Sequence, residues 1–137
     1  MNMPLFIVWN ESNAVGIQLL DEQHRGIVSI INTFYHLMHG KKDHQLLYSI
    51  ISDTMRTYSK LHFITEESFL DIANYKDIAE HKKTHEKLFH QIDVIERQCI
   101  KENDAEPLLE FLKYWWLRHI NVDDKQYAPT LLQYRQP

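Results

Sequence analysis

The sequence contains little cysteine, glycine or proline and no long apolar run. Its single cysteine, Cys99, has no second cysteine with which to form an internal disulfide, so we expect a reducing compartment, the cytoplasm. Only three glycines and four prolines occur, which argues against a turn-rich β-sandwich or barrel and favours long helices. The apolar run Leu5 to Trp9 is far shorter than the roughly 18 residues of a membrane span, and we expect no signal peptide. The formal net charge of -4 gives no electrostatic reason to bind nucleic acid or an anionic membrane.

What the sequence does contain is helical periodicity. Residues 1–137 are expected to form a single domain with an N-terminal arm over residues 1–20, a bundle over about 21–125 and a C-terminal tail. The fold class predicted is all-α, an antiparallel up-down-up-down four-helix bundle. The first helix is predicted to begin at an N-cap, Asp21, and to stop at Gly40, and the second to run from about Asp43 or His44 to about Ile72. Asp77 and Asp104 are the predicted N-caps of the third and fourth helices. Pro107 is expected in the first turn of the fourth helix, and Pro129 and the polar residues after it are expected to close the chain.

Nine histidines are many for a chain of 137 residues, and five of them fall on the core-facing side of a predicted helix. In an up-down-up-down bundle, the starts of helices one and three lie at the same end as the ends of helices two and four. One level of the bundle is therefore predicted to hold all five, which are His24, His62, His81, His85 and His119.

Two carboxylates are expected to join these imidazoles. Glu66 follows His62 by four residues, about 40° away around an ideal helix and one turn along. Asp124 follows His119 by five residues, which an ideal helix would rotate by about 140°. It reaches the site only if the fourth helix ends or loosens near residues 121–123, and Asp123 is the alternative ligand.

A lone histidine on an apolar helix face is more often a hydrogen-bonded core residue than a metal ligand. Five imidazoles and two carboxylates buried together without a cation, however, would strand polar atoms at a cost of roughly 1–3 kcal/mol each. The pattern therefore favours a metal site. His36, His39, His44 and His90 fall near loops or off the seam and are expected in solvent, and Glu67 is expected to be exposed or to support a ligand.

Four motifs resemble the hemerythrin family, specifically the single-domain bacterial form. They are WNESNAVGIQLLDEQH around His24, HFITEE around His62, HKKTH with its two histidines, and WLRHINVDD around His119, and they span residues 9–124 in the family's order. The resemblance implies two non-heme iron ions with a solvent-derived oxo or hydroxo bridge. It implies that one iron is held by His81, His85 and His119, the other by His24 and His62, and that Glu66 and Asp124 bridge them.

The function implied is reversible binding of O₂ at the second iron, which has one open position, in a carrier, storage or delivery protein that is not an enzyme. Low-level peroxidase-type activity stays open, and no protein client is indicated. The alternatives are an O₂ or redox sensor acting through a partner, and a peroxidase-like or NO-handling di-iron enzyme. Five neutral imidazoles with only two carboxylates favour binding of O₂ over oxidation, although such a site would also accept Zn²⁺. An apolar O₂ pocket is expected from Trp116, Ile120 and Phe63.

Overall fold

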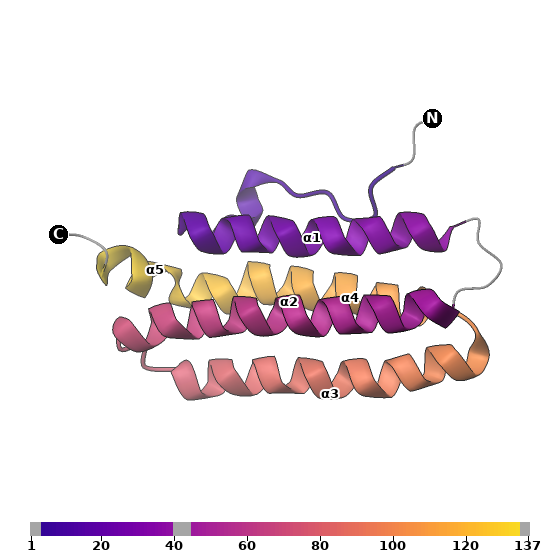
Figure 1. Ribbon diagram of the computed structural model, residues 1–137. Coiled ribbons are helices and arrows are strands. Elements are labelled where there is room, and N and C mark those ends of the chain that lie inside the picture. Colours follow the sequence, from indigo (N-terminus) through magenta and orange to yellow (C-terminus); the bar gives the residue numbers. More distant parts are fainter. Residues whose placement is uncertain (1–3, 40–44, 135–137) are drawn as a thin grey trace.

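The computed structural model describes residues 4–39 and 45–134, and these are helical over most of their length. Four helices, α1 to α4, form a bundle in which each helix runs antiparallel to the one before it in the chain (Figure 1). Their bounds are α1 Gln18–Met38, α2 Gln45–Ile72, α3 Ile78–Glu102 and α4 Glu106–Arg118, followed by the π-helix η2 His119–Asp123 and the short helix α5 Asp124–Tyr134. The predicted four-helix bundle is confirmed, and no strand occurs in the part of the chain that the structure describes.

Aliphatic residues at helical spacing form the centre of the bundle, because each helix turns one apolar stripe inward. The fully buried members come from all four helices, and include Ile27, Ile31, Ile51, Met55, Leu88, Ile92, Leu108 and Leu112. A second apolar cluster closes one end of the bundle, where Val15, Leu20 and Leu70 pack against Tyr127 and Leu131 of α5. None of the helices in the described ranges is both long and apolar enough to cross a membrane.

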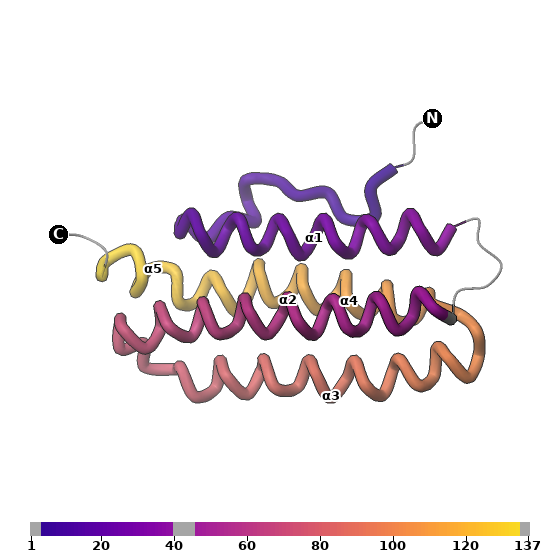
Figure 2. Tube along the Cα trace, in the orientation of Figure 1, coloured from indigo at the N-terminus to yellow at the C-terminus, as the bar shows by residue number. Residues whose placement is uncertain are grey.

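The N-terminal arm lies along the outside of α1, as Figure 2 shows. The Asn32 side chain fixes it, accepting from the Ile7 amide at 2.8 Å and donating to the Ile7 carbonyl at 2.9 Å. Phe6 stacks on Tyr35 at 4.3 Å between ring centroids. The arm also contains the short 3-10 helix η1 Glu11–Asn13, from which Asn13 Nδ2 donates to Asn121 Oδ1 of η2 at 2.7 Å. The arm is therefore part of the packed structure.

The predicted helix boundaries are right in the main and wrong in detail. Asp77 is the N-cap of α3, but Ala105 occupies the N-cap position of α4, where Asp104 was expected. The Asp104 side chain instead accepts from the Glu106 amide at 3.0 Å, and Pro107 lies in the first turn as predicted. Asn103 ends α3 in the left-handed conformation, which asparagine tolerates. The expected stop at Gly40, the expected start at Asp43 or His44, and the expected exposure of His44 lie outside the described residues.

Two predictions about the ends of the bundle were wrong. Asp21 is not the N-cap of the first helix, which begins three residues earlier at Gln18. The chain beyond about residue 125, expected to be a C-terminal tail closed by Pro129 and the polar residues after it, belongs to helix α5, which has Pro129 inside it. The proline does not end the helix because Tyr127, Ala128 and Leu131 bury their side chains against the second apolar cluster.

The Asp21 carboxylate turns back toward the arm and accepts two backbone hydrogen bonds. Its oxygens accept from the Val15 amide at 2.8 Å and from the Gly16 amide at 3.1 Å. Gly16 has φ +92°, a conformation that favours glycine, so the chain turns sharply here before α1 begins. Asp21 thereby connects the arm to the first turn of α1.

Replacing Asp21 with alanine is expected to lower the free energy of unfolding by about 1–3 kcal/mol, because two amides lose their acceptor. Chemical denaturation of the metal-free protein measures this without a contribution from metal binding. Asp21→Asn is the matched control, and it should cost less since its amide oxygen still accepts one of the two bonds. An unchanged stability of Asp21→Ala would contradict this role.

Candidate metal centre

All five core-facing histidines lie at one end of the bundle. His24 is in the second turn of α1, His62 is late in α2, His81 and His85 begin α3, and His119 follows α4. Each is at most 6% exposed. Figure 1 shows why they meet, since the starts of α1 and α3 lie beside the ends of α2 and α4. The predicted convergence of the five side chains is what the structure has.

The two expected carboxylates reach the same level by different routes. Glu66 is one α-helical turn beyond His62 and fully buried. Asp124 comes after the π-helix, and its amide donates to the carbonyl of His119, five residues earlier. The wider turn brings Asp124 back to the face that His119 occupies, so the required loosening of the helix near residues 121–123 is present. Asp123, the alternative, lies outside the cluster.

One oxygen of each carboxylate faces the Nε2 atoms of His81, His85 and His119, three of them near Glu66 and two near Asp124. Glu66 Oε1 is 2.5 Å from His81 Nε2, 3.0 Å from His85 Nε2 and 3.6 Å from His119 Nε2. Asp124 Oδ1 is 3.0 Å from His119 Nε2 and 3.3 Å from His81 Nε2. We call His81, His85 and His119 the three-histidine group.

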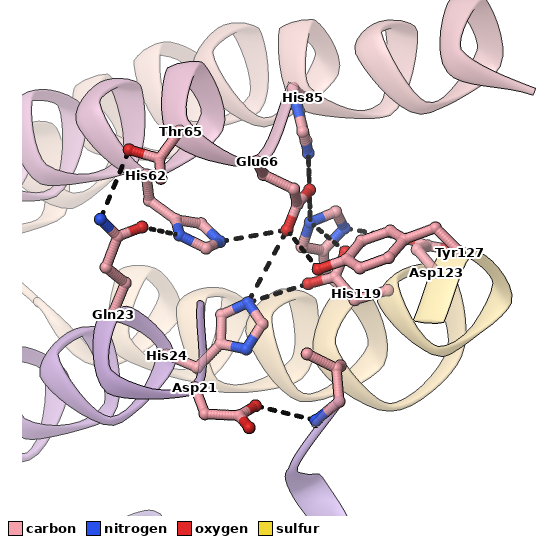
Figure 3. A network of polar contacts seen from close by, with 12 residues as sticks. Asp21, Gln23, His24, His62, Thr65, Glu66, His85, His119, Asp123 and Tyr127 are labelled. Carbon is pink, nitrogen blue, oxygen red and sulfur yellow. Dashed lines mark hydrogen bonds and ion pairs between the residues drawn. The ribbon is translucent and has the colours of Figure 1, made fainter. Parts of the chain in front are cut away.

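The other oxygen of each carboxylate faces the remaining two histidines, which we call the two-histidine group. Asp124 Oδ2 is 2.9 Å from His24 Nε2. Glu66 Oε2 is 3.3 Å from His62 Nε2 and 3.9 Å from His24 Nε2. Figure 3 shows His24 and His62 approaching Glu66 from the side opposite to His85. Each carboxylate thus presents one oxygen to each group.

The outer nitrogens of three of these rings contact side chains that fix their orientation. His62 Nδ1 lies 2.7 Å from Gln23 Oε1 and His85 Nδ1 lies 2.7 Å from Glu67 Oε2. His119 Nδ1 lies 3.2 Å from Asp123 Oδ2. An acceptor at Nδ1 holds the proton there and leaves Nε2 free to bind a cation, which is the usual arrangement around metal-bound histidines. The contacts of Gln23 and Asp123 were not predicted.

Tyr127 of α5 also enters the site, and its hydroxyl donates to Glu66 Oε2 at 3.0 Å. Burial and the charges of Asp124 and Glu66 raise the pKa of Tyr127 well above its usual value, so it stays a donor. Sequence reasoning missed this residue because the chain beyond about residue 125 was expected to be a tail. The signal was available, since Tyr127 follows Asp124 by three residues and shares its face if the helix continues.

The residues expected to line an O₂ pocket are all buried beside the site. The Phe63 ring stacks on His85 at 3.7 Å between centroids, and Trp116 lies 5.9 Å from His62 and 5.7 Å from His119. Ile120 is fully buried in η2. These three side chains supply an apolar wall, and their role as a pocket for O₂ stays a prediction.

Several buried polar atoms in the cluster have no hydrogen-bonding partner of suitable geometry. They are both ring nitrogens of His24, Nε2 of His62 and both carboxylate oxygens of Asp124. Buried polar atoms without partners are costly. Cations placed between these atoms would satisfy them, so the residues present fit metal binding.

Two sets of donor atoms are compact enough to hold a metal ion. Glu66 groups with the three-histidine group, and Glu66 and Asp124 group with the two-histidine group, with the donor atoms of each set within 4.8 Å of one another. Imidazole nitrogen with carboxylate oxygen suits iron and zinc.

Without a bound cation, the two carboxylates hold protons on neighbouring imidazoles. Burial opposes the charged form of His24 and of His81, but contacts with Asp124 and Glu66 raise the pKa of each to about 9. The pKa of His119 is likewise raised, whereas burial dominates at His62 and lowers its pKa. Burial also opposes ionisation of the carboxyl groups, yet the contacts from the histidines hold their pKa values below the usual range.

These features together define a metal-binding helical bundle with a centre rich in histidine. Residues 15–131 match the family model described as the hemerythrin HHE cation binding domain. The chain belongs to the hemerythrin family.

Its relatives include bacterial proteins of similar length. The bacteriohemerythrin of Pseudomonas paraeruginosa (strain DSM 24068 / PA7) is 31% identical over 126 residues, which cover 91% of this chain and 81% of that protein. The bacteriohemerythrin of Clostridium acetobutylicum is 27% identical over 129 residues, covering 88% and 97%. A crystal structure of wild-type hemerythrin has the same fold, with a TM-score of 0.77 and 23% identity over 92% of this chain and 98% of that one.

The metal-free protein is expected to lose stability as the pH rises from about 6.5 to 9. Between these values His24 and His81 bind protons in the folded state but not in the unfolded state, where the histidine pKa is about 6.5. Their contribution is therefore complete below pH 6.5 and is lost as the pH passes through 9. The carboxyl groups are ionised in both states throughout this window, and His62, whose folded-state pKa is lowered, opposes the trend only near pH 6.5, where the unfolded chain still protonates it in part. The free energy of unfolding should fall by at least about 1 kcal/mol per pH unit.

Denaturation at a series of pH values measures this dependence, and the same series with saturating Zn²⁺ is the control. A bound metal ion replaces the protons, so the fall in stability should disappear or reverse. A flat profile for the metal-free protein between pH 6.5 and 9 would contradict the assigned protonation.

Proposed function

We propose that this chain binds O₂ reversibly at a centre of two non-heme iron ions and acts as an oxygen carrier, store or delivery protein rather than as an enzyme. Membership of the hemerythrin family supports iron as the metal, and the matched relatives include bacteriohemerythrins and a hemerythrin. The proposal depends on the arrangement of this chain's own seven side chains.

The observation that carries it is that Glu66 and Asp124 each direct one oxygen to each histidine group. In this arrangement both carboxylates would bridge two ions, one held by the three-histidine group and the other by the two-histidine group. The three-histidine group would supply three nitrogens to one ion and the two-histidine group two nitrogens to the other, with two carboxylate oxygens for each. With a solvent-derived oxo or hydroxo bridge these counts would be six and five, which would leave one position for O₂ at the two-histidine group.

When bound, the two irons supply electrons to O₂ and recover them when it leaves. The protein's contribution is to keep the net charge of the centre low and to exclude water from it. Two carboxylates and five neutral imidazoles leave two ferrous ions with a low net charge, which a buried site tolerates. Phe63, Trp116 and Ile120 limit the entry of water and so oppose loss of the reduced state. Tyr127 holds the orientation of Glu66 through its hydroxyl.

Glu66→Gln and Glu67→Gln form a matched pair that tests the bridging role. Both substitutions remove one carboxylate charge from adjacent positions of α2, but only Glu66 faces both histidine groups. Glu66→Gln is expected to reduce bound iron below two ions per chain. Glu67→Gln is expected to keep two ions with an affinity weakened by no more than about 10–100-fold, because Glu67 contacts only the outer nitrogen of His85.

Iron analysis of both purified variants, with circular dichroism to establish that they fold, distinguishes these outcomes. Two tightly bound ions in Glu66→Gln would contradict the bridging role, as would loss of both ions from Glu67→Gln alone.

Reversible O₂ binding is tested by an anaerobic absorption titration. The iron-loaded protein is reduced, exposed to O₂ and then flushed with inert gas. We expect two irons per chain and a charge-transfer band that forms with O₂ and disappears on its removal. The same protein is then supplied with hydrogen peroxide and a reducing dye. Rapid irreversible oxidation, or sustained turnover of peroxide, would contradict a carrier and favour a redox sensor or an enzyme.

A further inference from the structure

Two rings of the three-histidine group have a carboxylate at their outer nitrogen. His85 Nδ1 lies 2.7 Å from Glu67 Oε2, and His119 Nδ1 lies 3.2 Å from Asp123 Oδ2. The side chains of Glu67 and Asp123 are each 26% exposed, so the two charges lie between the buried rings and the surface. A carboxylate that accepts the Nδ1 proton makes the other nitrogen of the imidazole a stronger donor to a cation. The negative charges of Glu67 and Asp123 therefore strengthen binding at the three-histidine group.

The outer nitrogens of the two-histidine group meet no such charge among the described residues. His62 Nδ1 lies 2.7 Å from the side-chain amide oxygen of Gln23, which is neutral. His24 Nδ1 is buried and has no hydrogen-bonding partner in the described part of the chain. The Nε2 atoms of these two rings are therefore less basic than those of His85 and His119.

The contact between Gln23 and His62 is fixed by Thr65, as Figure 3 shows. The Thr65 hydroxyl donates to the carbonyl of Leu61 at 2.9 Å, so its oxygen can accept from Gln23 Nε2 at 3.4 Å. With its N–H directed to Thr65, the amide presents its oxygen to His62, and His62 Nδ1 is the donor. His62 is thus oriented with Nε2 toward the centre, but without a negative charge at its outer nitrogen.

The two buried carboxylates do not distinguish the two groups. Glu66 and Asp124 each direct one oxygen to each group. A difference in affinity between two cations bound there would therefore come from the imidazoles and from their outer contacts.

We propose that the outer contacts make the two cation positions unequal, so that the three-histidine group is filled first and the two-histidine group second. Glu67 and Asp123 are positioning residues that strengthen the first position, and Gln23 is a positioning residue that keeps the second position weaker. The third imidazole of the first group acts in the same direction. A chain that holds one ion would therefore lack the ion at which O₂ is proposed to bind. The inference rests on the two-cation centre of the proposed function, but not on iron or on O₂.

Zinc identifies the position that is filled first. Crystals of the metal-free chain with one equivalent of Zn²⁺ are measured by anomalous diffraction at the zinc edge. We expect one peak beside the three-histidine group, and a second peak beside the two-histidine group with two equivalents. Equal peaks at one equivalent, or a first peak beside His24 and His62, would overturn the proposed order alone. A chain that never shows more than one peak would overturn the two-cation centre as well.

Calorimetric titration with Zn²⁺ in competition with a chelator tests the residues that cause the difference. Glu67→Gln should weaken the tighter binding step at least about tenfold and leave the weaker step nearly unchanged. Gln23→Glu should strengthen the weaker step about tenfold, because it places a carboxylate at the outer nitrogen of His62. A gain in affinity is not expected from a substitution that only disturbs packing.

Each variant has a matched control at an exposed position. Glu86→Gln removes the same charge next to His85 in the sequence, and Gln18→Glu adds the same charge on α1. Both controls should keep the two binding steps of the wild-type chain, and circular dichroism should report a folded protein in all four variants. Equal effects of Glu67→Gln and Glu86→Gln, or no gain in Gln23→Glu over Gln18→Glu, would overturn the role of the outer contacts.

Discussion

Two carboxylates, those of Glu66 and Asp124, are fully buried at one end of the bundle, and their negative charge must be balanced there. Five imidazoles from four helical segments lie close enough to do so, as protonated side chains or as ligands of cations. Much of the surrounding structure can be understood from this requirement. The helices must be antiparallel and in register at this end, and apolar clusters must exclude water on both sides.

The π-helix η2 is the local adjustment that makes the second carboxylate available. In a regular helix, the residue five positions beyond His119 would point away from the site, and η2 corrects this by widening one turn. The same segment is supported from outside, because Asn13 of the arm donates to Asn121 and because α5 continues into the second apolar cluster. π-turns within helices often occur at functional sites. Here the widened turn has a definite structural consequence, the placement of Asp124.

The sequence was sufficient to predict the fold and the residues that converge, because helical periodicity determines which side chains face the core. His24, His62 and Glu66 followed directly from that reasoning. Asp124 could be predicted only conditionally, because it faces the site only if one turn of the helix widens to a π-helix. The helix preferences of the individual residues do not indicate such a turn. Helix α5 was missed because Pro129 was given more weight than the burial of Tyr127, and the hydroxyl contact with Glu66 was missed with it. Asp21 was given a capping role from its residue type alone, whereas the sharp turn at Gly16 decides its actual partners.

The central claim is that Glu66 and Asp124 bridge two metal ions between the histidine groups. Anomalous diffraction at the iron edge from crystals of the iron-loaded protein tests it most directly. The account predicts two anomalous peaks per chain, one beside His81, His85 and His119 and the other beside His24 and His62, with one oxygen of each carboxylate directed to each peak. A single peak, or peaks remote from these side chains, would contradict it.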